Sequence, residues 1–223
     1  MRLGKLVDIE NQSIKNMRAA ITMRIVKANG YDEPRDAISH DWLKLLIDME
    51  MVPVVVPNIL SDTAGYLEAE SVDILILTGG DNIGVTPLRD VTESALLASA
   101  INRRIPIFGV CRGLQVINHY FGGSLKPIKG HIACSHKVVF VDCWKELYGH
   151  SCNVNSYHEI GVGLEGLSRE LVPASFDETG QIEALYHQDK PIAAVMWHPE
   201  RVGGVEGDKN LMRRLLYEGA FWK

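Results

Sequence analysis

The chain has 223 residues, of which 46% are hydrophobic and 23% are charged, and its formal net charge is −5. This composition is typical of a globular protein with one sizeable core, and it lacks the clustered positive charge that nucleic-acid binding uses. No apolar run approaches the roughly 20 residues of a membrane span, and the start of the chain lacks the apolar core of a signal peptide. We therefore expect a cytoplasmic protein that binds neither nucleic acid nor a membrane.

Short apolar runs rich in β-branched residues alternate with amphipathic helical patterns along the chain. Runs that are apolar on both faces favour a parallel sheet covered by helices on each side. We predict a doubly wound, mostly parallel α/β fold, with one domain over residues 17–223, an extension over residues 1–16, and loops with short strands over 143–190. Strands are predicted at 19–25, 52–57, 73–80, 105–110, 137–142 and 192–200, and helices at 34–51, 89–104 and 112–121.

The stretch "IPIFGVCRGLQVINHYFGG" places Cys111 between a predicted strand and a predicted helix. Gly109 and Gly113 flank it in a Gly-x-Cys-x-Gly pattern, and small neighbours permit a sharp, strained turn that exposes a nucleophile. The start of a helix also favours a thiolate. A free cysteine is equally often a small buried hydrophobe, so partners elsewhere in the chain decide between the two interpretations.

The stretch "WHPE" offers a base and a carboxylate two positions apart. If the preceding residues form a strand, His198 and Glu200 leave the same face at its carboxyl end. A thiol nucleophile needs such a base, and the base needs an orienting acceptor. Acyl chemistry also needs N–H donors for an oxyanion, and Gly79 and Gly80, which end a buried strand, and Arg112, which follows the cysteine, are candidates.

These motifs resemble the class I glutamine amidotransferase superfamily, and the likeness extends from about residue 19 onward. The resemblance implies Cys111 as nucleophile, His198 as base and Glu200 as its orienter. It also implies an oxyanion hole formed by the N–H groups of Gly80 and Arg112, and a γ-glutamyl thioester intermediate. No cofactor is implied.

Within the superfamily, "VNSYHE" and "IEALYHQDKPIAAVMWHPE" look like stand-alone γ-glutamyl hydrolases of the peptidase C26 type. Several stretches are most similar to the γ-glutamyl-CDP-amidate hydrolases of capsule synthesis, which implies release of glutamate and cytidine diphosphoramidate. The stretch "FGGSL" is similar to γ-glutamyl hydrolases in general, so a γ-glutamyl-γ-aminobutyrate hydrolase of polyamine catabolism is an alternative. A glutaminase subunit that delivers ammonia to a partner synthetase, and a binding protein on the same fold, are further alternatives.

Other polar residues are candidates for holding a small γ-glutamyl substrate. Ser156 and Tyr157 offer main-chain groups to its α-carboxylate, and Gln115 lies one turn beyond the nucleophile. A nucleotide leaving group calls for cations. The candidates are Arg24 after the first strand, Arg35 at the start of a helix and Arg201 after the "WHPE" motif.

The remaining cysteines and histidines form no recognisable zinc pattern. His131, Cys134 and His136 are closely spaced, with Cys143, His150 and Cys152 further on, but the spacings match no zinc motif. We expect reduced thiols and no metal site. A homodimer is left open as an alternative to a monomer.

Overall fold

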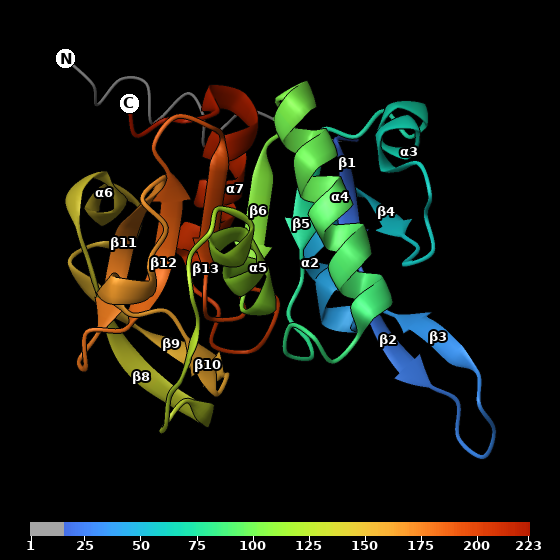
Figure 1. Ribbon diagram of the computed structural model, residues 1–223. Helices are drawn as coiled ribbons and strands as arrows, with labels where there is room; N and C mark the ends of the chain where they lie inside the picture. Colours follow the sequence, from blue (N-terminus) through green and yellow to red (C-terminus); the bar gives the residue numbers. More distant parts are fainter. Residues whose placement is uncertain (1–15) are drawn as a thin grey trace.

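The computed structural model describes residues 16–223, and its centre is a nine-stranded sheet in the order β4-β1-β5-β6-β13-β12-β11-β8-β9 (Figure 1). The predicted extension over residues 1–16 lies outside the described residues apart from Asn16. The strands of the sheet, in chain order, are β1 (Arg18–Thr22), β4 (Val52–Val56), β5 (Ile74–Leu77), β6 (Ile107–Val110), β8 (Ile132–Phe140), β9 (Ser151–Tyr157), β11 (Leu171–Asp177), β12 (Ile182–His187) and β13 (Ile192–Val195).

Helices and short strands complete the fold. Two small antiparallel pairs lie outside the main sheet: β2 (Arg24–Lys27) with β3 (Pro34–Ala37), and β7 (Lys126–Pro127) with β10 (Ile160–Gly161). The helices are α2 (His40–Asp48), α3 (Thr63–Ala69), α4 (Pro87–Arg103), α5 (Arg112–Tyr120), α6 (Lys145–Tyr148) and α7 (Glu206–Glu218), with single 3-10 turns η1 (Asp142–Trp144) and η2 (Leu164–Gly166). No helix among residues 16–223 is long and apolar enough to cross a membrane.

Successive residues of the parallel strands enter two separate cores. In β5, Ile74 and Ile76 pack with α2 and α7 on one face of the sheet, whereas Leu75 and Leu77 pack with α3, α4 and α5 on the other. Side chains alternate between the faces of a strand, so a strand covered on both sides is apolar throughout. The predicted doubly wound α/β class with helices on both faces is confirmed.

The two halves of the sheet differ in direction. Strands β4, β1, β5, β6 and β13 pair in parallel, whereas β13, β12, β11, β8 and β9 pair antiparallel. The range 143–190, predicted as loops with short strands, instead contains β9, β11 and β12 of the central sheet. Buried polar residues such as Ser175, Glu183 and His187 gave these strands the composition of a loop.

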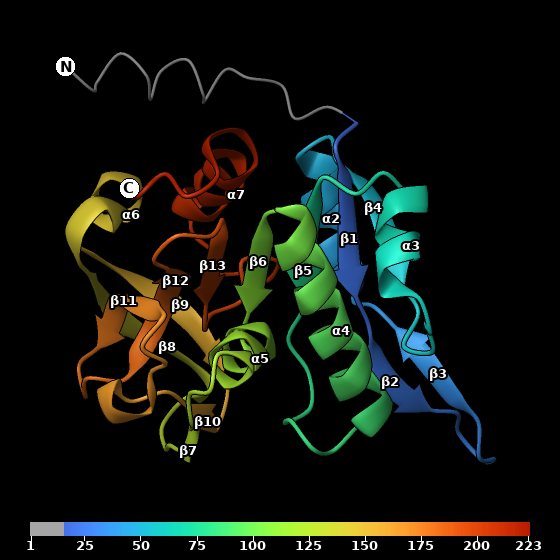
Figure 2. The same cartoon turned by 45° about the horizontal axis from the view of Figure 1, so that its top comes forward.

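The segment before α2 also departs from the prediction. Residues 34–37 form β3 instead of the first turn of a helix, and α2 begins only at His40. Ser39 caps the helix, since its side chain accepts a hydrogen bond from the Asp41 N–H at 3.2 Å. Pro34 pairs with Lys27 at the loop end of the β2–β3 hairpin, which projects beyond the sheet in Figure 2.

Candidate active site

Cys111 occupies the turn between β6 and α5. Its backbone has φ 52° and ψ −104°, a positive φ that costs a residue with a side chain on the order of 1–3 kcal/mol. A Cβ atom on Gly109 would lie 2.9 Å from the Gly113 carbonyl carbon, and one on Gly113 would lie 2.2 Å from the carbonyl oxygen of Leu77. The strained strand-to-helix turn is thus present, and both glycines are required by close backbone approach.

The Cys111 thiol is buried, and burial raises its pKa to about 12. The Arg112 N–H opposes this shift by donating a hydrogen bond to the sulfur, and the charge of Glu200 adds to it. The sequence favoured a thiolate at the helix start, but loss of solvation outweighs that effect here. Cys111 is therefore a neutral thiol at rest, and a base has to remove its proton before the sulfur can attack a carbonyl.

His198 and Glu200 lie in the loop that follows β13. His198 Nδ1 is 2.7 Å from Glu200 Oε1, and both side chains are buried. Asn155 holds the main chain of His198 from both sides, because its Oδ1 accepts from the His198 N–H at 2.8 Å and its Nδ2 donates to the His198 carbonyl at 2.9 Å. The contact with Glu200 orients the imidazole and leaves Nε2 free for a proton.

Gly79 brings the cysteine and the histidine together. A Cβ atom at this position would lie 3.5 Å from Cys111 Cβ, 3.5 Å from His198 Nε2 and 2.7 Å from His198 Cε1. The Cys111 and His198 side chains therefore both approach one glycine, which lies just after β5. The next residue, Gly80, has a positive φ of 151° that favours glycine.

A pocket of about 340 Å³ opens over the thiol. Main-chain and side-chain groups from both halves of the sheet form its wall. They are Gly80, Asp81, Asn82, Val85, Cys111, Gln115, Ile132, Tyr157, His158 and Glu159. This is the carboxyl end of the parallel strands, where doubly wound sheets place their ligands.

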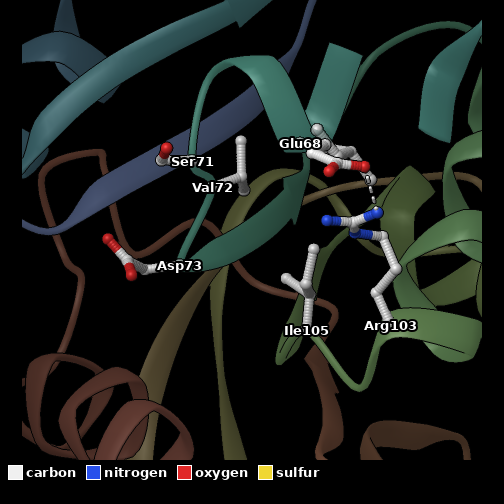
Figure 3. Close-up of a pocket in the computed structure, with 7 residues that line it drawn as sticks. Glu68, Ser71, Val72, Asp73, Arg103 and Ile105 are labelled. Atoms are coloured by element: carbon white, nitrogen blue, oxygen red, sulfur yellow. Dashed lines mark hydrogen bonds and ion pairs between the residues drawn. The ribbon is translucent and has the colours of Figure 1, made fainter. Parts of the chain in front are cut away.

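A larger hollow of about 580 Å³ lies at the opposite end of the strands (Figure 3). Figure 3 shows Asp73, which precedes β5, and the ion pair between Glu68 and Arg103 at the rim of this hollow. It contains no thiol and no histidine, so its lining offers no nucleophile or base comparable to those around Gly79.

Three residues predicted to contact the substrate lie in or near the pocket over the Cys111 thiol, and their surroundings differ. Gln115 is buried and lines the pocket, and its Nε2 donates to the Ile160 carbonyl at 2.9 Å. Tyr157 also lines the pocket, and its ring meets that of His198 edge to face at 5.5 Å. Ser156 is fully buried, and its hydroxyl donates to the His131 carbonyl at 2.8 Å. The side chain of Ser156 therefore supports the wall behind the pocket.

The three predicted arginines have separate locations. The Cβ of Arg24 lies 3.7 Å from where a Gly80 Cβ would be, so this side chain starts beside the pocket. The guanidinium of Arg201 lies over the Tyr157 ring at 4.3 Å. Arg35 does not open a helix, as the sequence predicted, but lies in β3, where it pairs with Glu33 at 2.6 Å.

Sequence reasoning missed a buried ionic network behind the glycine pair. Arg89 is fully buried, pairs with Glu93 at 2.8 Å and donates to the carbonyls of Thr78 and Gly79 at 2.9 and 3.2 Å. The Arg112 side chain pairs with the same Glu93 and with Asp90. Burial lowers the pKa of each arginine to about 10, so both stay charged near neutral pH. The network fixes the end of β5 against α5.

Arg89 and Glu93 gave a signal in the sequence, because they are spaced four residues apart on one helix face. That spacing is typical of exposed helix pairs, which is why it did not point to the site. Asn155 gave no comparable signal, since it acts through the main chain of a residue 43 positions away.

Comparison with known proteins identifies the family of this chain. The sequence pattern of the peptidase C26 family matches residues 19–200. A γ-glutamyl-CDP-amidate hydrolase of Campylobacter jejuni is 30% identical over 198 residues, which cover 85% of this chain and 92% of that protein. A γ-glutamyl-γ-aminobutyrate hydrolase of Escherichia coli is 28% identical over 220 residues, covering 82% and 84%.

Solved structures agree on the fold. The crystal structure of a glutamine amidotransferase from Thermotoga maritima matches with a TM-score of 0.62 at 14% identity, covering 83% of this chain and 76% of that one. A Thermoplasma acidophilum structure matches with a TM-score of 0.70 at 22% identity, covering 90% and 92%. With the family pattern spanning most of the chain and placing Cys111 and His198 within it, this chain belongs to the peptidase C26 family.

Proposed function

We propose that the chain is a cysteine-dependent hydrolase of γ-glutamyl amides and γ-glutamyl phosphoramidates. The observation that carries this proposal is that Cys111, which lines the pocket, and His198, which contacts Glu200, both lie close to the same point beside Gly79. Covalent acyl transfer requires a nucleophile, a base within reach and a third group that orients the base. The three side chains supply these roles.

The reaction proceeds in two steps. In the first, His198 Nε2 takes the Cys111 proton while the sulfur attacks the γ-carbonyl carbon, and the N–H groups of Gly80 and Arg112 stabilise the oxyanion. His198 then gives the proton to the leaving nitrogen as the C–N bond breaks. In the second step, His198 activates a water molecule that hydrolyses the thioester. Glu200 holds the imidazole in the required tautomer throughout.

Within this class we propose γ-glutamyl-CDP-amidate as the substrate, with release of glutamate and cytidine diphosphoramidate for capsule modification. Cleavage through a thioester breaks the C–N bond, so the P–N bond stays with the product. The Campylobacter jejuni relative supports this choice. So do Arg24, whose Cβ lies beside Gly80, and Arg201, whose guanidinium lies over the Tyr157 ring, as candidate cations for the diphosphate. The carboxylates of Asp81 and Glu159 line the pocket and suit the α-ammonium group of the glutamyl end.

The test is glutamate release from γ-glutamyl-CDP-amidate, γ-glutamyl-γ-aminobutyrate and glutamine, with Cys111→Ala as the blank. We expect the highest kcat/KM for the nucleotide substrate. Preference for the γ-aminobutyrate conjugate would make the chain a counterpart of the Escherichia coli relative. Turnover of glutamine only with an added synthetase would indicate a glutaminase subunit, and activity on none of these would refute the proposal.

Arginine variants test the contact with the leaving group. We expect Arg24→Ala to raise KM for the nucleotide substrate about tenfold or more, since a hydrogen bond to a charged group contributes roughly 1.5–3 kcal/mol. The same variant should leave KM for the γ-aminobutyrate conjugate unchanged. Arg103→Ala, at the far end of the strands, is the control. Equal effects of Arg24→Ala on both substrates would exclude a role in nucleotide binding.

A further inference from the structure

Five titratable side chains meet behind the pocket wall that contains His158. They lie in or next to the strands β8, β9, β11 and β12. His131 directly precedes β8, His136 lies within β8, His158 follows β9, Asp177 ends β11 and Glu183 lies in β12. All except the half-buried His136 are buried. One nitrogen each of His131 and His158 and one oxygen of Glu183 lie within 4.8 Å of one another.

Hydrogen bonds to main-chain carbonyls locate one proton on two of these histidines. His131 Nδ1 lies 3.0 Å from the Lys129 carbonyl, and His158 Nδ1 lies 3.2 Å from the Ile160 carbonyl. A carbonyl oxygen only accepts, so each Nδ1 carries a hydrogen and each neutral ring directs the lone pair of Nε2 into the cluster. A carbonyl acceptor on the other ring nitrogen is also how proteins orient histidines that bind metals.

Those lone pairs meet carboxylates instead of donors. His131 Nε2 lies 3.0 Å from Asp177 Oδ2 and 3.8 Å from Glu183 Oε1, and His158 Nε2 lies 3.7 Å from the same Glu183 oxygen. Among residues 16–223, His158 Nε2 and both Glu183 oxygens have no hydrogen-bond partner. Buried lone pairs that face each other at these distances repel unless a proton or a metal cation lies between them.

Protons on the histidines would satisfy only part of this cluster. A second proton on His131 would give Asp177 a donor, and a charged His136 would balance Glu183 Oε2, which lies 3.3 Å from its Nε2. His158 Nε2 and Glu183 Oε1 would still face each other across 3.7 Å with no donor between them. One divalent cation at the centre would satisfy all of these atoms together.

We propose that this cluster binds one Zn²⁺ ion through His131 Nε2, His158 Nε2 and the Glu183 carboxylate. Two imidazoles with carboxylates suit zinc, whereas Mg²⁺ and Ca²⁺ prefer oxygen ligands alone. Tetrahedral zinc with bonds of about 2.0–2.1 Å places its ligand atoms about 3.3 Å apart. The observed separations of 3.7 and 3.8 Å therefore need to contract by about half an ångström.

This inference departs from the expectation of no metal site. The sequence search considered neighbours in the chain, and of its candidates only His131 and His136 reach the cluster. The Cys134 thiol donates to the Gly130 carbonyl at 3.1 Å instead. The other ligands, His158 after β9 and Glu183 in β12, are far apart in the sequence, so no local spacing could reveal them.

A zinc ion here would hold the substrate pocket in shape. His158 lines the pocket, so a bond from its Nε2 would tie that wall to Glu183 near the start of β12. All three protein ligands are buried, so the ion would lie in the interior of the protein. The ion would support the pocket wall and take no part in the chemistry of Cys111.

Zinc binding by the full-length chain is the direct test, and it does not depend on any substrate. The purified protein is stripped with a chelator, titrated with Zn²⁺, and analysed for bound metal by mass spectrometry and for Tm. We expect one zinc per chain and a Tm rise of about 5–10 °C at a hundredfold excess over Kd. Less than a tenth of a zinc per chain with no change in Tm would overturn the proposal.

Variants identify the ligands. Glu183→Gln and His158→Asn should each lose the bound zinc, whereas His187→Asn, which alters a buried histidine paired with Glu170, should retain it. Cys111→Ser should also retain it. Full zinc retention in Glu183→Gln would overturn the proposal. If both ligand variants fail to fold, the wild-type chain loaded with Co²⁺ decides: four-coordinate d–d bands without a thiolate charge-transfer band support this site, and a thiolate band refutes it.

Discussion

Replacing Gly79 by alanine tests whether the spacing between thiol and imidazole governs the reaction. The backbone of Gly79 does not have a positive φ, so alanine can adopt it without backbone strain. The added Cβ would lie 2.7 Å from His198 Cε1 and 3.5 Å from Cys111 Cβ. Only the first contact is too short, so the methyl group should push the imidazole aside and leave the cysteine in place.

The displacement can be estimated from ordinary contact distances. Ordinary contacts of a Cβ atom begin at 3.4 Å, so His198 has to retreat by about 0.7 Å. A misplacement of about 1 Å near the reacting atoms lowers rates by about 10²-fold. We therefore expect kcat to fall between about 10-fold and 100-fold, with a loss of about 1–3 kcal/mol in the free energy of unfolding from overpacking.

Gly123→Ala is the matched control, because its Cβ would meet the Asn118 side chain at 2.3 Å, away from the pocket. Both variants are compared in urea unfolding and in glutamate release per folded molecule. Gly123→Ala should lose stability while its kcat stays unchanged. A Gly79→Ala enzyme with kcat within twofold of wild type would refute the reasoning about His198.

Three further predictions concern buried charges. Burial raises the pKa of Cys111 to about 12, so its alkylation by iodoacetamide at pH 7 should be slower than that of a free cysteine peptide. The rate, followed by peptide mass spectrometry, should rise tenfold per pH unit. A plateau of the rate near pH 7 would contradict this prediction. Arg89→Met should lower the free energy of unfolding by about 3–5 kcal/mol, because it leaves buried hydrogen-bond acceptors unpaired. Arg103→Met, which breaks an exposed ion pair on the same helix, should lower it by less than about 1 kcal/mol. Equal losses for the two variants in urea unfolding would disprove this difference. Burial raises the pKa of Asp208 to about 7. The stability that Asp208 contributes is therefore complete below its unfolded pKa of about 3.9 and falls as the pH rises to about 7. Asp208→Asn should remove this pH dependence of the free energy of unfolding, and an unchanged pH dependence would exclude Asp208 as its source.

Most of the parallel half of the fold was predictable because the residue patterns that indicate its strands and turns lie within short stretches of the sequence. Ile74 to Leu77 are apolar on both faces, which indicates a covered strand, and Gly109 and Gly113 indicate a sharp turn at Cys111. The contact between His198 and Glu200 was predictable for the same reason, since two positions separate them.

Within the antiparallel half, β9, β11 and β12 were not predictable from local patterns, whereas the strands predicted at 137–142 and 192–200 overlap β8 and β13. Glu183 and Ser175 are fully buried, yet polar residues in a sequence favour the surface. Their burial depends on partners from other strands, such as His131 and His136, which no period of two or of 3.6 can reveal. The pKa of Cys111 was missed for a related reason: the turn places the thiol at a helix start, but the surrounding strands decide how much water reaches it.

The account rests most directly on a covalent intermediate at Cys111. The chain is mixed with γ-glutamyl-CDP-amidate, quenched in acid within one turnover and analysed by intact and peptide mass spectrometry. We predict a mass increase of one glutamyl acyl group on the peptide that contains Cys111, and none in the Cys111→Ala variant. Glutamate release by the Cys111→Ala variant at the wild-type rate, with no acylated peptide in either protein, would contradict the account.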